Sequence, residues 1–309
     1  MKVYILSRNK SLYSTKRLVE AATEKGWDVR VLDYLKFSVE IMKGELKIHY
    51  DGQILDAPDA IVPRIGASRT FYGTAMVRHL EGMNAFSTAG SLAISRSRDK
   101  LRSLQILSQH EVDMPKTVFA SNKSDAKDII KLSGGTPLVL KILEGTQGVG
   151  VVLVDTQKAA KSVLDAFYGM DVNLLVQEFI EEAGGADIRA IVVDGQVVGA
   201  MRRQGAEGDF RSNLHQGGSA TLYKLSRKEK STAVAAAKAM GLGVCGVDMI
   251  ESKRGPLVME VNSSPGLEGI EKATGLDIAG KIMDYIEKNV TPTDGSTKPK
   301  RRPKDKIGA

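Results

Sequence analysis

The feature that most constrains this chain is a predicted β-hairpin near its C-terminal end. Residues 246–250 read Gly-Val-Asp-Met-Ile, and residues 259–266 read Met-Glu-Val-Asn-Ser-Ser-Pro-Gly. Both stretches are short, apolar and alternating, which is the pattern of strands with one buried face. Between them, Lys253-Arg254-Gly255 is typical of a three-residue hairpin loop in which glycine supplies a left-handed residue. The sequence therefore predicts two antiparallel strands that pair about Arg254.

This pairing brings three oxygen ligands to one point. It places Asp248 opposite Glu260, and Glu260 shares a face with Asn262 because side chains alternate across a strand. Two carboxylates and an amide, with no His or Cys among them, suit Mg²⁺ or Mn²⁺ better than zinc. A hairpin with charges on its solvent face is the alternative. The Ser-Ser-Pro-Gly loop beside the acids favours the metal site.

Composition narrows the class of protein. The 309 residues are 42% hydrophobic and 26% charged, which is ordinary for a soluble protein of two or three compact units. No apolar run is long enough to cross a bilayer, and the chain starts in a strand-like segment instead of a signal peptide, so we expect a cytoplasmic protein. Cys245 is the single cysteine, and its apolar setting predicts a buried thiol. Among the histidines, only His215 is expected near a site.

Residues 291–309 carry much of the net charge of +7. This stretch has six Lys or Arg residues against two Asp, with three prolines and few apolar residues. Such a segment cannot bury enough surface to fold, so it is predicted to be a disordered basic tail. A solvated end without function is one interpretation. A basic arm that weakly contacts RNA or an acidic protein is the other.

The order of predicted elements divides the rest of the chain into three units, 1–94, 95–180 and 181–290. The first alternates strands (3–6, 28–32, 60–62) with helices (12–25, 70–81) as a βαβ unit does, with a hairpin over 45–54. The second begins with a helix over 98–110 and continues with strands (137–142, 151–154, 174–179) and helices (124–132, 157–168). The third has paired strands (187–193, 196–202), a polar loop (204–219), a helix (226–240), the hairpin and further helices up to about residue 290.

A glycine-rich loop lies between two strands of the second unit. Residues 144–150 read Glu-Gly-Thr-Gln-Gly-Val-Gly, which is not a P-loop because no Gly-Lys-Ser/Thr follows and the next element is a strand. Gly145 and Gly148 let backbone amides approach phosphate oxygens, so the loop is interpreted as a flap over a nucleotide. Lys141, inside the apolar strand before the flap, needs an anionic partner such as phosphate. An edge-strand lysine that faces water is the alternative.

Other polar stretches are candidates for ligand contact. Lys100 opens a helix, where an anion would also meet free amide groups, although an ordinary helix-start cation is the alternative. Glu178 and Asp187 flank a Gly-Gly hinge at 184–185 whose backbone could read an adenine edge. The loop at 209–218 contains an arginine, polar donors and a Gly-Gly turn that could hold a γ-phosphate and a developing oxyanion. A polar surface loop is the alternative there.

In this order the motifs resemble the ATP-grasp superfamily and, more narrowly, the RimK family. The resemblance rests on residues 7–8, 63–66, 98–102, 144–148, 208–213 and 260–271, and it spans residues 1–290, whereas the tail departs from the family pattern. It implies an α/β (α+β ATP-grasp) fold. In that fold an N-terminal Rossmann-like pre-ATP-grasp domain precedes two ATP-grasp subdomains that bind the nucleotide between them.

The resemblance also implies an activity. RimK proteins are glutamate ligases that modify the sixth small-subunit ribosomal protein. A similar chain is expected to add free L-glutamate to the C-terminal carboxylate of that protein with ATP, through an acyl phosphate, and to polymerise glutamate there. An ATP-grasp ligase acting on a small-molecule or carrier-bound carboxylate is the alternative, and a nucleotide-responsive ribosome or RNA binder is the non-enzymatic one. A homotetramer is expected from the family.

Site residues follow from the same resemblance. One or two Mg²⁺ or Mn²⁺ ions are expected on Asp248, Glu260 and Asn262. The nucleotide is expected to contact Lys100, Lys141, Gly145, Gly148, Glu178, Phe179, Asp187, Arg211, Ser212 and Asn213. The catalytic groups that act on the transferring phosphoryl group and the oxyanion are expected to be Arg211 and Asn213. Because a guanidinium fork matches a carboxylate, the candidates for the carboxylates of glutamate are Arg64, Arg202 and Arg203.

Overall fold

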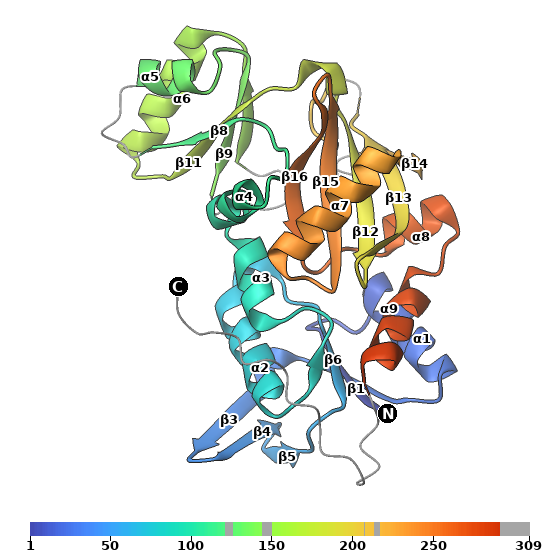
Figure 1. Cartoon of the computed structure of the whole chain (residues 1–309). Coiled ribbons are helices and arrows are strands. Elements are labelled where there is room, and N and C mark those ends of the chain that lie inside the picture. Colours follow the sequence, from blue (N-terminus) through green and yellow to red (C-terminus); the bar gives the residue numbers. More distant parts are fainter. Residues whose placement is uncertain (121–125, 144–149, 207, 213–216, 291–309) are drawn as a thin grey trace.

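The structure of the protein is a computed structural model that describes residues 1–120, 126–143, 150–206, 208–212 and 217–290. The described strands form four sheets (Figure 1). None of the described helices is both long and apolar enough to cross a membrane. The structure confirms the mixed α/β class that the sequence predicts.

The first sheet is parallel and has the strand order β2-β1-β6-β7. Its strands are β1 (Lys2–Leu6), β2 (Asp28–Leu32), β6 (Ala60–Pro63) and β7 (Phe86–Ser87), and α1 (Tyr13–Glu24) connects β1 to β2. Beside it lies a small antiparallel sheet of β3 (Phe37–Met42), β4 (Glu45–Tyr50) and β5 (Gln53–Leu55). The β4–β5 hairpin was predicted. Strand β3 was missed because only Phe37 of its side chains is fully buried, so its pattern gives little signal.

Two helices replace the single helix predicted over 98–110. They are α3 (Ser91–Arg98) and α4 (Lys100–Gln109), and they follow α2 (Thr70–Gly82). Asp99 has extended backbone angles, φ −85° and ψ 102°, so it ends α3, and its side chain accepts a hydrogen bond from the backbone N–H of Arg102. This is an N-cap contact, which favours a helix start at the next residue. Lys100 therefore opens a helix, as predicted.

The second sheet is antiparallel, with the order β10-β9-β11-β8. Its strands are β8 (Thr117–Phe119), β9 (Leu138–Ile142), β10 (Val151–Val154) and β11 (Leu174–Glu178). The helices α5 (Ala126–Leu132) and α6 (Gln157–Gly169) pack against it through one apolar cluster and form the upper left part of Figure 1. Because β9 lies between two other strands, Lys141 is not an edge-strand residue.

The third sheet is also antiparallel, with the order β14-β13-β12-β15-β16. Its strands are β12 (Ala186–Val193), β13 (Gln196–Gln204), β14 (Ser219–Leu222), β15 (Val244–Ser252) and β16 (Gly255–Asn262). Helix α7 (Arg227–Met240) lies across one face (Figure 1) and starts with a capping box of Ser226 and Glu229. Strand β14, which was not predicted, starts where the predicted polar loop ends. The last helices are α8 (Glu268–Thr274) and α9 (Ile278–Asn289).

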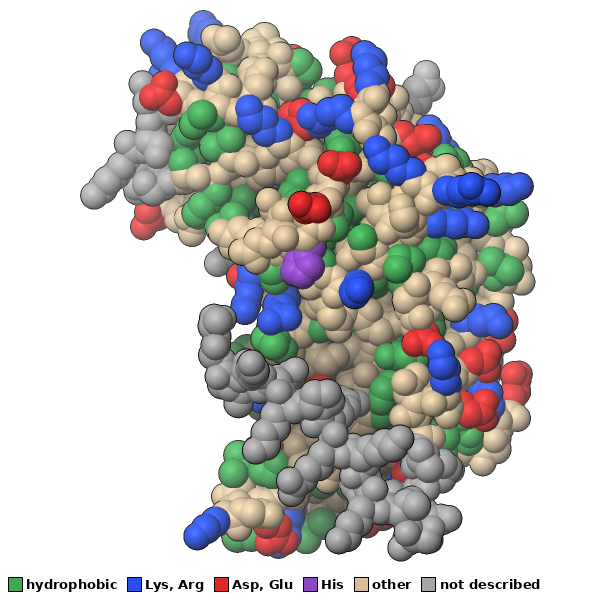
Figure 2. Space-filling view, viewed as in Figure 1, with side chains coloured by type: hydrophobic (Ala, Val, Ile, Leu, Met, Phe, Trp, Pro, Cys, Tyr) green, Lys and Arg blue, Asp and Glu red, His purple; other side chains and the backbone are tan. Residues whose placement is uncertain are grey.

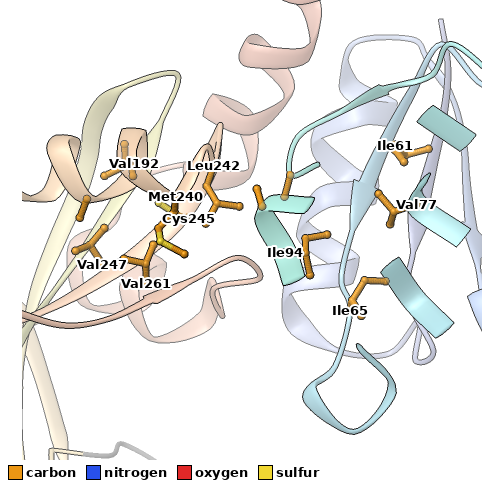
Figure 3. Close-up of a cluster of buried hydrophobic side chains, with 14 of the residues drawn as sticks. Ile61, Ile65, Val77, Ile94, Val192, Met240, Leu242, Cys245, Val247 and Val261 are labelled. Atoms are coloured by element: carbon orange, nitrogen blue, oxygen red, sulfur yellow. The ribbon is translucent and has the colours of Figure 1, made fainter. Parts of the chain in front are cut away.

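A continuous core joins the first unit to the third sheet. One buried cluster contains Ile65 and Ile94 of the first unit together with Leu242 and Val261 of the third, and Figure 3 shows Ile94 at the junction between the two halves. Cys245 lies in this cluster with no exposed surface, and burial raises the pKa of its thiol to about 12, which confirms the predicted buried thiol. The core therefore holds the carboxyl edge of the parallel sheet against the hairpin.

Basic side chains are not confined to the tail. On the face seen in Figure 2, Lys and Arg side chains gather over the upper half of the molecule. Helix α7 contributes exposed cations at Arg227, Lys228, Lys230 and Lys238. The predicted basic tail, residues 291–309, lies outside the described residues. The described part of the chain thus has basic surface of its own.

Candidate active site

The predicted hairpin has the predicted register but a different loop. Ser252 pairs with Gly255, so the loop has two residues, and the three-residue loop expected from the sequence is wrong by one position. Asp248 nevertheless pairs with Glu260, because the register shifts after Asp248 and Met249 pairs with Val258. This is a β-bulge, which adds one residue to one strand. Without it Glu260 would move to the other face of the sheet.

Asp248 is held by two arginines. It is 2% exposed, and its carboxylate accepts hydrogen bonds from Nε and Nη2 of Arg189 at 2.6 and 2.5 Å and from Nη2 of Arg203 at 2.9 Å. Arg203 also binds Asp187 bidentately, with Nε 2.6 Å from the nearer oxygen. Burial opposes ionisation of Asp248, but the two guanidinium groups outweigh it and hold the pKa of Asp248 well below its usual range. The four side chains form one buried ionic network.

The alternation of β12 explains why this network lies at one end of the sheet. Asp187, Arg189, Ile191 and Val193 share a face because their spacing is two residues. Ile191 and Val193 belong to the apolar cluster that includes α9, whereas the two charged residues lie beside Asp248 and Arg203. One face of the sheet is therefore apolar at one end and charged at the other, and the charged end faces the hairpin.

Glu260 of the third unit lies among cations of the second and third units. Its side chain is 56% exposed, and one oxygen is 4.0 Å from Nη2 of Arg189. Its charge also acts on Arg98 and Lys100 and on Lys141 of β9. The surrounding protein and the charge of Asp248 raise the pKa of Glu260. We call Glu260 and these four cations the Glu260 site.

The donor set fits a hard divalent cation. Asp248 and Glu260 are opposite each other, and Asn262 follows on the same face, opposite Gly246. The Oδ1 atom of Asn262 accepts a hydrogen bond from the backbone N–H of Ser264 at 3.0 Å and retains a second lone pair. Within the described residues, no three His, Cys, Asp or Glu side chains gather as a metal site, and the third oxygen donor of this set is the amide of Asn262. A cation here would relieve the repulsion between the two carboxylates.

Two lysines approach Glu260 from the second unit and its leading helix. Nζ of Lys141 donates to Oε1 of Gln177 at 2.6 Å, and burial lowers its pKa to about 8 although Glu260 raises it. Nζ of Lys100 donates to the carbonyl oxygens of Ile142 and Leu143 at 2.8 and 3.0 Å. Lys100 therefore contacts the end of β9 and the residue after it, just before the glycine-rich loop. Residues 144–149 of that loop, including Gly145 and Gly148, lie outside the described residues.

The remaining candidates lie around the hinge between the second and third units. Glu178 accepts a hydrogen bond from the backbone N–H of Lys116 at 2.7 Å and forms an ion pair with Arg254. The rings of Phe179 and Phe210 pack edge to face with centroids 6.4 Å apart. This contact places Phe210, at the start of the loop at 209–218, beside the end of β11.

Within that loop, Arg211 binds the carboxylate of Asp209 through Nε and Nη2 at 3.0 Å each. Ser212 is 7% exposed. Asn213 and His215 lie outside the described residues.

The structure changes two of the candidates for carboxylate binding. Arg203 is 5% exposed, and both Asp187 and Asp248 occupy its guanidinium, so it is not free to bind glutamate. Arg202 pairs with Glu251 at the surface of the hairpin. The sequence prediction also missed Arg189. An arginine two residues after Asp187 in a strand was the signal, because the two must share a face.

Two family models match the chain, one over its N-terminal unit and one over the rest of the chain up to residue 286. A RimK pre-ATP-grasp domain matches residues 1–94, and a RimK-like ATP-grasp domain matches residues 97–286. The chain belongs to the RimK family of ATP-grasp proteins. This confirms the resemblance and the fold class predicted from the motifs. The exact boundaries between the units stay a prediction.

Relatives of this RimK family chain are similar over almost their whole length. A probable alpha-L-glutamate ligase of Aliivibrio salmonicida (strain LFI1238) is 59% identical over 300 residues, which cover 97% of this chain and 100% of the relative. A protein of Halorhodospira halophila (strain DSM 244 / SL1) with the same description is 57% identical over 301 residues, with the same coverage. The uncovered 3% is shorter than the tail, so these alignments extend into residues 291–309, whereas the RimK-like ATP-grasp model ends at residue 286.

Solved structures show the same fold at low identity. The ATP-grasp ligase PsnB complexed with a phosphomimetic variant of its minimal precursor, Mg and ADP has a TM-score of 0.73 and 18% identity to the RimK family chain, covering 93% of it and 98% of PsnB. A RimK domain protein ATP-grasp from Sphaerobacter thermophilus DSM 20745 has a TM-score of 0.69 and 20% identity, covering 92% and 99%. These matches support the fold.

Proposed function

We propose that the chain is a cytoplasmic ATP-dependent α-L-glutamate ligase that adds glutamate to the C-terminal carboxylate of a small-subunit ribosomal protein. Its membership in the RimK family and the names of its relatives support this class of ADP-forming ligase. The observation that carries the proposal is the Glu260 site, where cations from the second and third units surround an acid pair. Such an array suits the charges of a nucleotide triphosphate, its metal ion and a carboxylate.

Each predicted residue receives a role in this proposal. Asp248, Glu260 and Asn262 would hold one or two Mg²⁺ or Mn²⁺ ions, which when bound neutralise phosphate charge. The phosphates would contact Lys100, Lys141 and the amides of Gly145 and Gly148; adenosine would lie beside Glu178 and Phe179; and the transferring phosphoryl group and the oxyanion would face Arg211, Ser212 and Asn213. Asp187 is buried, so its role would be to position Arg203 and Ser212 beside the nucleotide.

The proposed reaction has two steps. An oxygen of the acceptor carboxylate attacks the γ-phosphorus of ATP, forming an acyl phosphate and releasing ADP. The amine of glutamate then attacks the activated carbonyl, forming an amide and releasing phosphate, and the amine loses its extra proton to solvent. A carboxylate is a poor electrophile with a poor leaving group, and phosphorylation corrects both defects. The protein contributes mainly position and charge neutralisation.

Mass spectrometry tests the proposal. The full chain incubated with ATP, Mg²⁺, L-glutamate and the ribosomal acceptor should give a ladder of acceptor masses spaced by one glutamyl residue. Rapid amidation of a small carboxylate, with no ladder on the protein, would favour the small-molecule ligase instead. ATP binding without glutamate-dependent ADP release would favour the nucleotide-responsive binder.

The lowered pKa of Lys141 predicts a pH dependence of ATP use. Below pH 8 its ammonium is charged and attracts phosphate, and above pH 8 the free enzyme loses this charge. The value of kcat/KM for ATP should therefore fall above an apparent pKa of about 8. Lys141→Met should lower kcat/KM about 10- to 100-fold, the value of one charge-assisted hydrogen bond, and remove this alkaline limb. A limb that persists in the variant would assign the titration to another group.

A further inference from the structure

The carboxyl edge of the N-terminal parallel sheet lies against the loop that follows the metal hairpin. Strand β6 ends at Pro63, whose carbonyl oxygen accepts a hydrogen bond from Oγ of Ser264 at 3.3 Å. Arg64 is the next residue. In open α/β sheets, ligands bind outside the carboxyl ends of the strands. Arg64 therefore lies directly after the strand end that contacts the loop following the hairpin. A ligand bound at the Glu260 site could contact the first unit at this position.

Arg98 joins Arg64 from the end of α3. Its Nη2 atom donates to the carbonyl oxygen of Ile65 at 2.6 Å, which fixes the guanidinium beside the Arg64 segment. Ile94 lies one turn earlier on α3 and belongs to the same buried cluster as Ile65 (Figure 3). The core thus positions both arginines. The charge of Glu260 acts on Arg98, which links the pair to the Glu260 site.

These arginines differ from Arg189 and Arg203 because no carboxylate pairs with them in the described part of the chain. The Nε atom of Arg98 is buried without a hydrogen-bond partner. Burial, together with repulsion from Arg98, lowers the pKa of Arg64 to about 10. Both side chains are only partly exposed, and charged side chains withdrawn from solvent are normally paired, so two neighbouring guanidinium groups without a carboxylate indicate the place of an anion.

The proposed carboxylate contacts differ in chemistry from the proposed phosphate contacts. Arg64 and Arg98 carry guanidinium groups, whereas Lys100 and Lys141 carry ammonium groups. Paired guanidinium forks also match a planar carboxylate better than single ammonium groups do.

We propose that Arg64 of the first unit and Arg98 at the start of the second form a carboxylate-binding subsite for a substrate of the ligase. The inference rests on the proposed function and adds residues that recognise the substrate. The bound carboxylate belongs either to free L-glutamate or to the C-terminus of the acceptor. Both sources have the same chemistry, and kinetics separates them.

Steady-state kinetics of Arg64→Gln and Arg98→Gln tests the subsite. We expect the KM for one carboxylate substrate to rise about 10- to 100-fold, the value of a charge-assisted hydrogen bond, while the KM for ATP stays within about threefold. A rise for glutamate places glutamate in the subsite, and a rise for the acceptor places the acceptor there. Arg69→Gln is the control, because Arg69 is exposed in the same connection. Unchanged KM values for both substrates, or an equal rise for ATP, would overturn the subsite.

A binding measurement keeps this test independent of turnover and of folding defects. Calorimetric titration of the full chain with L-glutamate, with a peptide ending in a free carboxylate and with its carboxamide needs no reaction. The wild-type chain should bind one of the two carboxylate ligands, prefer the free peptide to its carboxamide if that ligand is the peptide, and lose the binding in the Gln variants. Arg64→Lys and Arg98→Lys keep the charge and should bind more weakly than wild type but better than the Gln variants. Equal binding by wild type and Gln variants rejects the subsite, whereas absent glutamylation alone rejects the proposed function.

Discussion

Replacing Glu260 by glutamine is expected to lower ATP turnover at least about 100-fold. Loss of a partner in the outer shell of a metal site typically costs 10- to 100-fold, and Glu260 is proposed to contact the ion itself. The substitution also removes the charge that acts on Lys100, Lys141 and Arg98. The side chain is 56% exposed and glutamine has nearly the same shape, so the fold should persist. Glutamate-dependent ADP release, followed as a function of Mg²⁺ concentration, measures the effect.

A matched control lies in the same hairpin. Glu251 is on β15, its side chain is 45% exposed, and it pairs with Arg202 at the surface instead of facing Glu260. Glu251→Gln should leave turnover within about twofold of wild type, because exposed ion pairs contribute little. Equal losses in both variants would point to a folding effect, and full activity of Glu260→Gln would remove Glu260 from the metal site.

Replacing Arg203 by methionine is expected to destabilise the protein by about 3–5 kcal/mol. This is the usual cost of removing one partner of a buried ion pair, because the remaining charge is left without compensation. Arg203 binds both Asp187 and Asp248, which are 4% and 2% exposed. Methionine fills much of the same volume, so the loss reflects charge more than cavity formation. Urea unfolding of the full chain, followed by circular dichroism, gives the free energy of unfolding.

The neighbouring residue provides the comparison. Arg202→Met removes an ion pair whose partners are 38% and 45% exposed, so it should cost less than about 1 kcal/mol. The two substitutions are chemically identical, but Arg203 is buried with two carboxylate partners and Arg202 is partly exposed with one. A cost below 1 kcal/mol for Arg203→Met as well would show that the network does not stabilise the fold.

The sequence predicted those parts of the site that depend on local pattern. Alternation along β15 and β16 placed Asp248, Glu260 and Asn262 on one face, and the family motifs led to the fold confirmed here. The burial of Cys245 followed from its apolar neighbours. A strand period of two residues is enough for such predictions, because it fixes the face on which each side chain lies.

Features set by long-range contacts were not predicted. The sequence prediction gave the hairpin loop one residue too many and did not include the bulge beside Met249. The two errors cancelled, so Asp248 was still placed opposite Glu260. Arg203 was assigned to substrate because its chemistry suits a carboxylate, and only the fold shows that Asp187 and Asp248 occupy it. A guanidinium looks the same in sequence whether its carboxylate belongs to the chain or to a ligand.

The central claim is that the site activates a substrate carboxylate by phosphorylation, and isotope transfer tests it directly. The acceptor is prepared with ¹⁸O in its C-terminal carboxylate and incubated with the enzyme, ATP, Mg²⁺ and L-glutamate, and the released phosphate is analysed by mass spectrometry. Transfer through an acyl phosphate predicts one ¹⁸O atom in the inorganic phosphate released by the first addition to each acceptor and none in the nucleotide. Label in AMP, or a singly glutamylated acceptor formed with unlabelled phosphate, would contradict the mechanism.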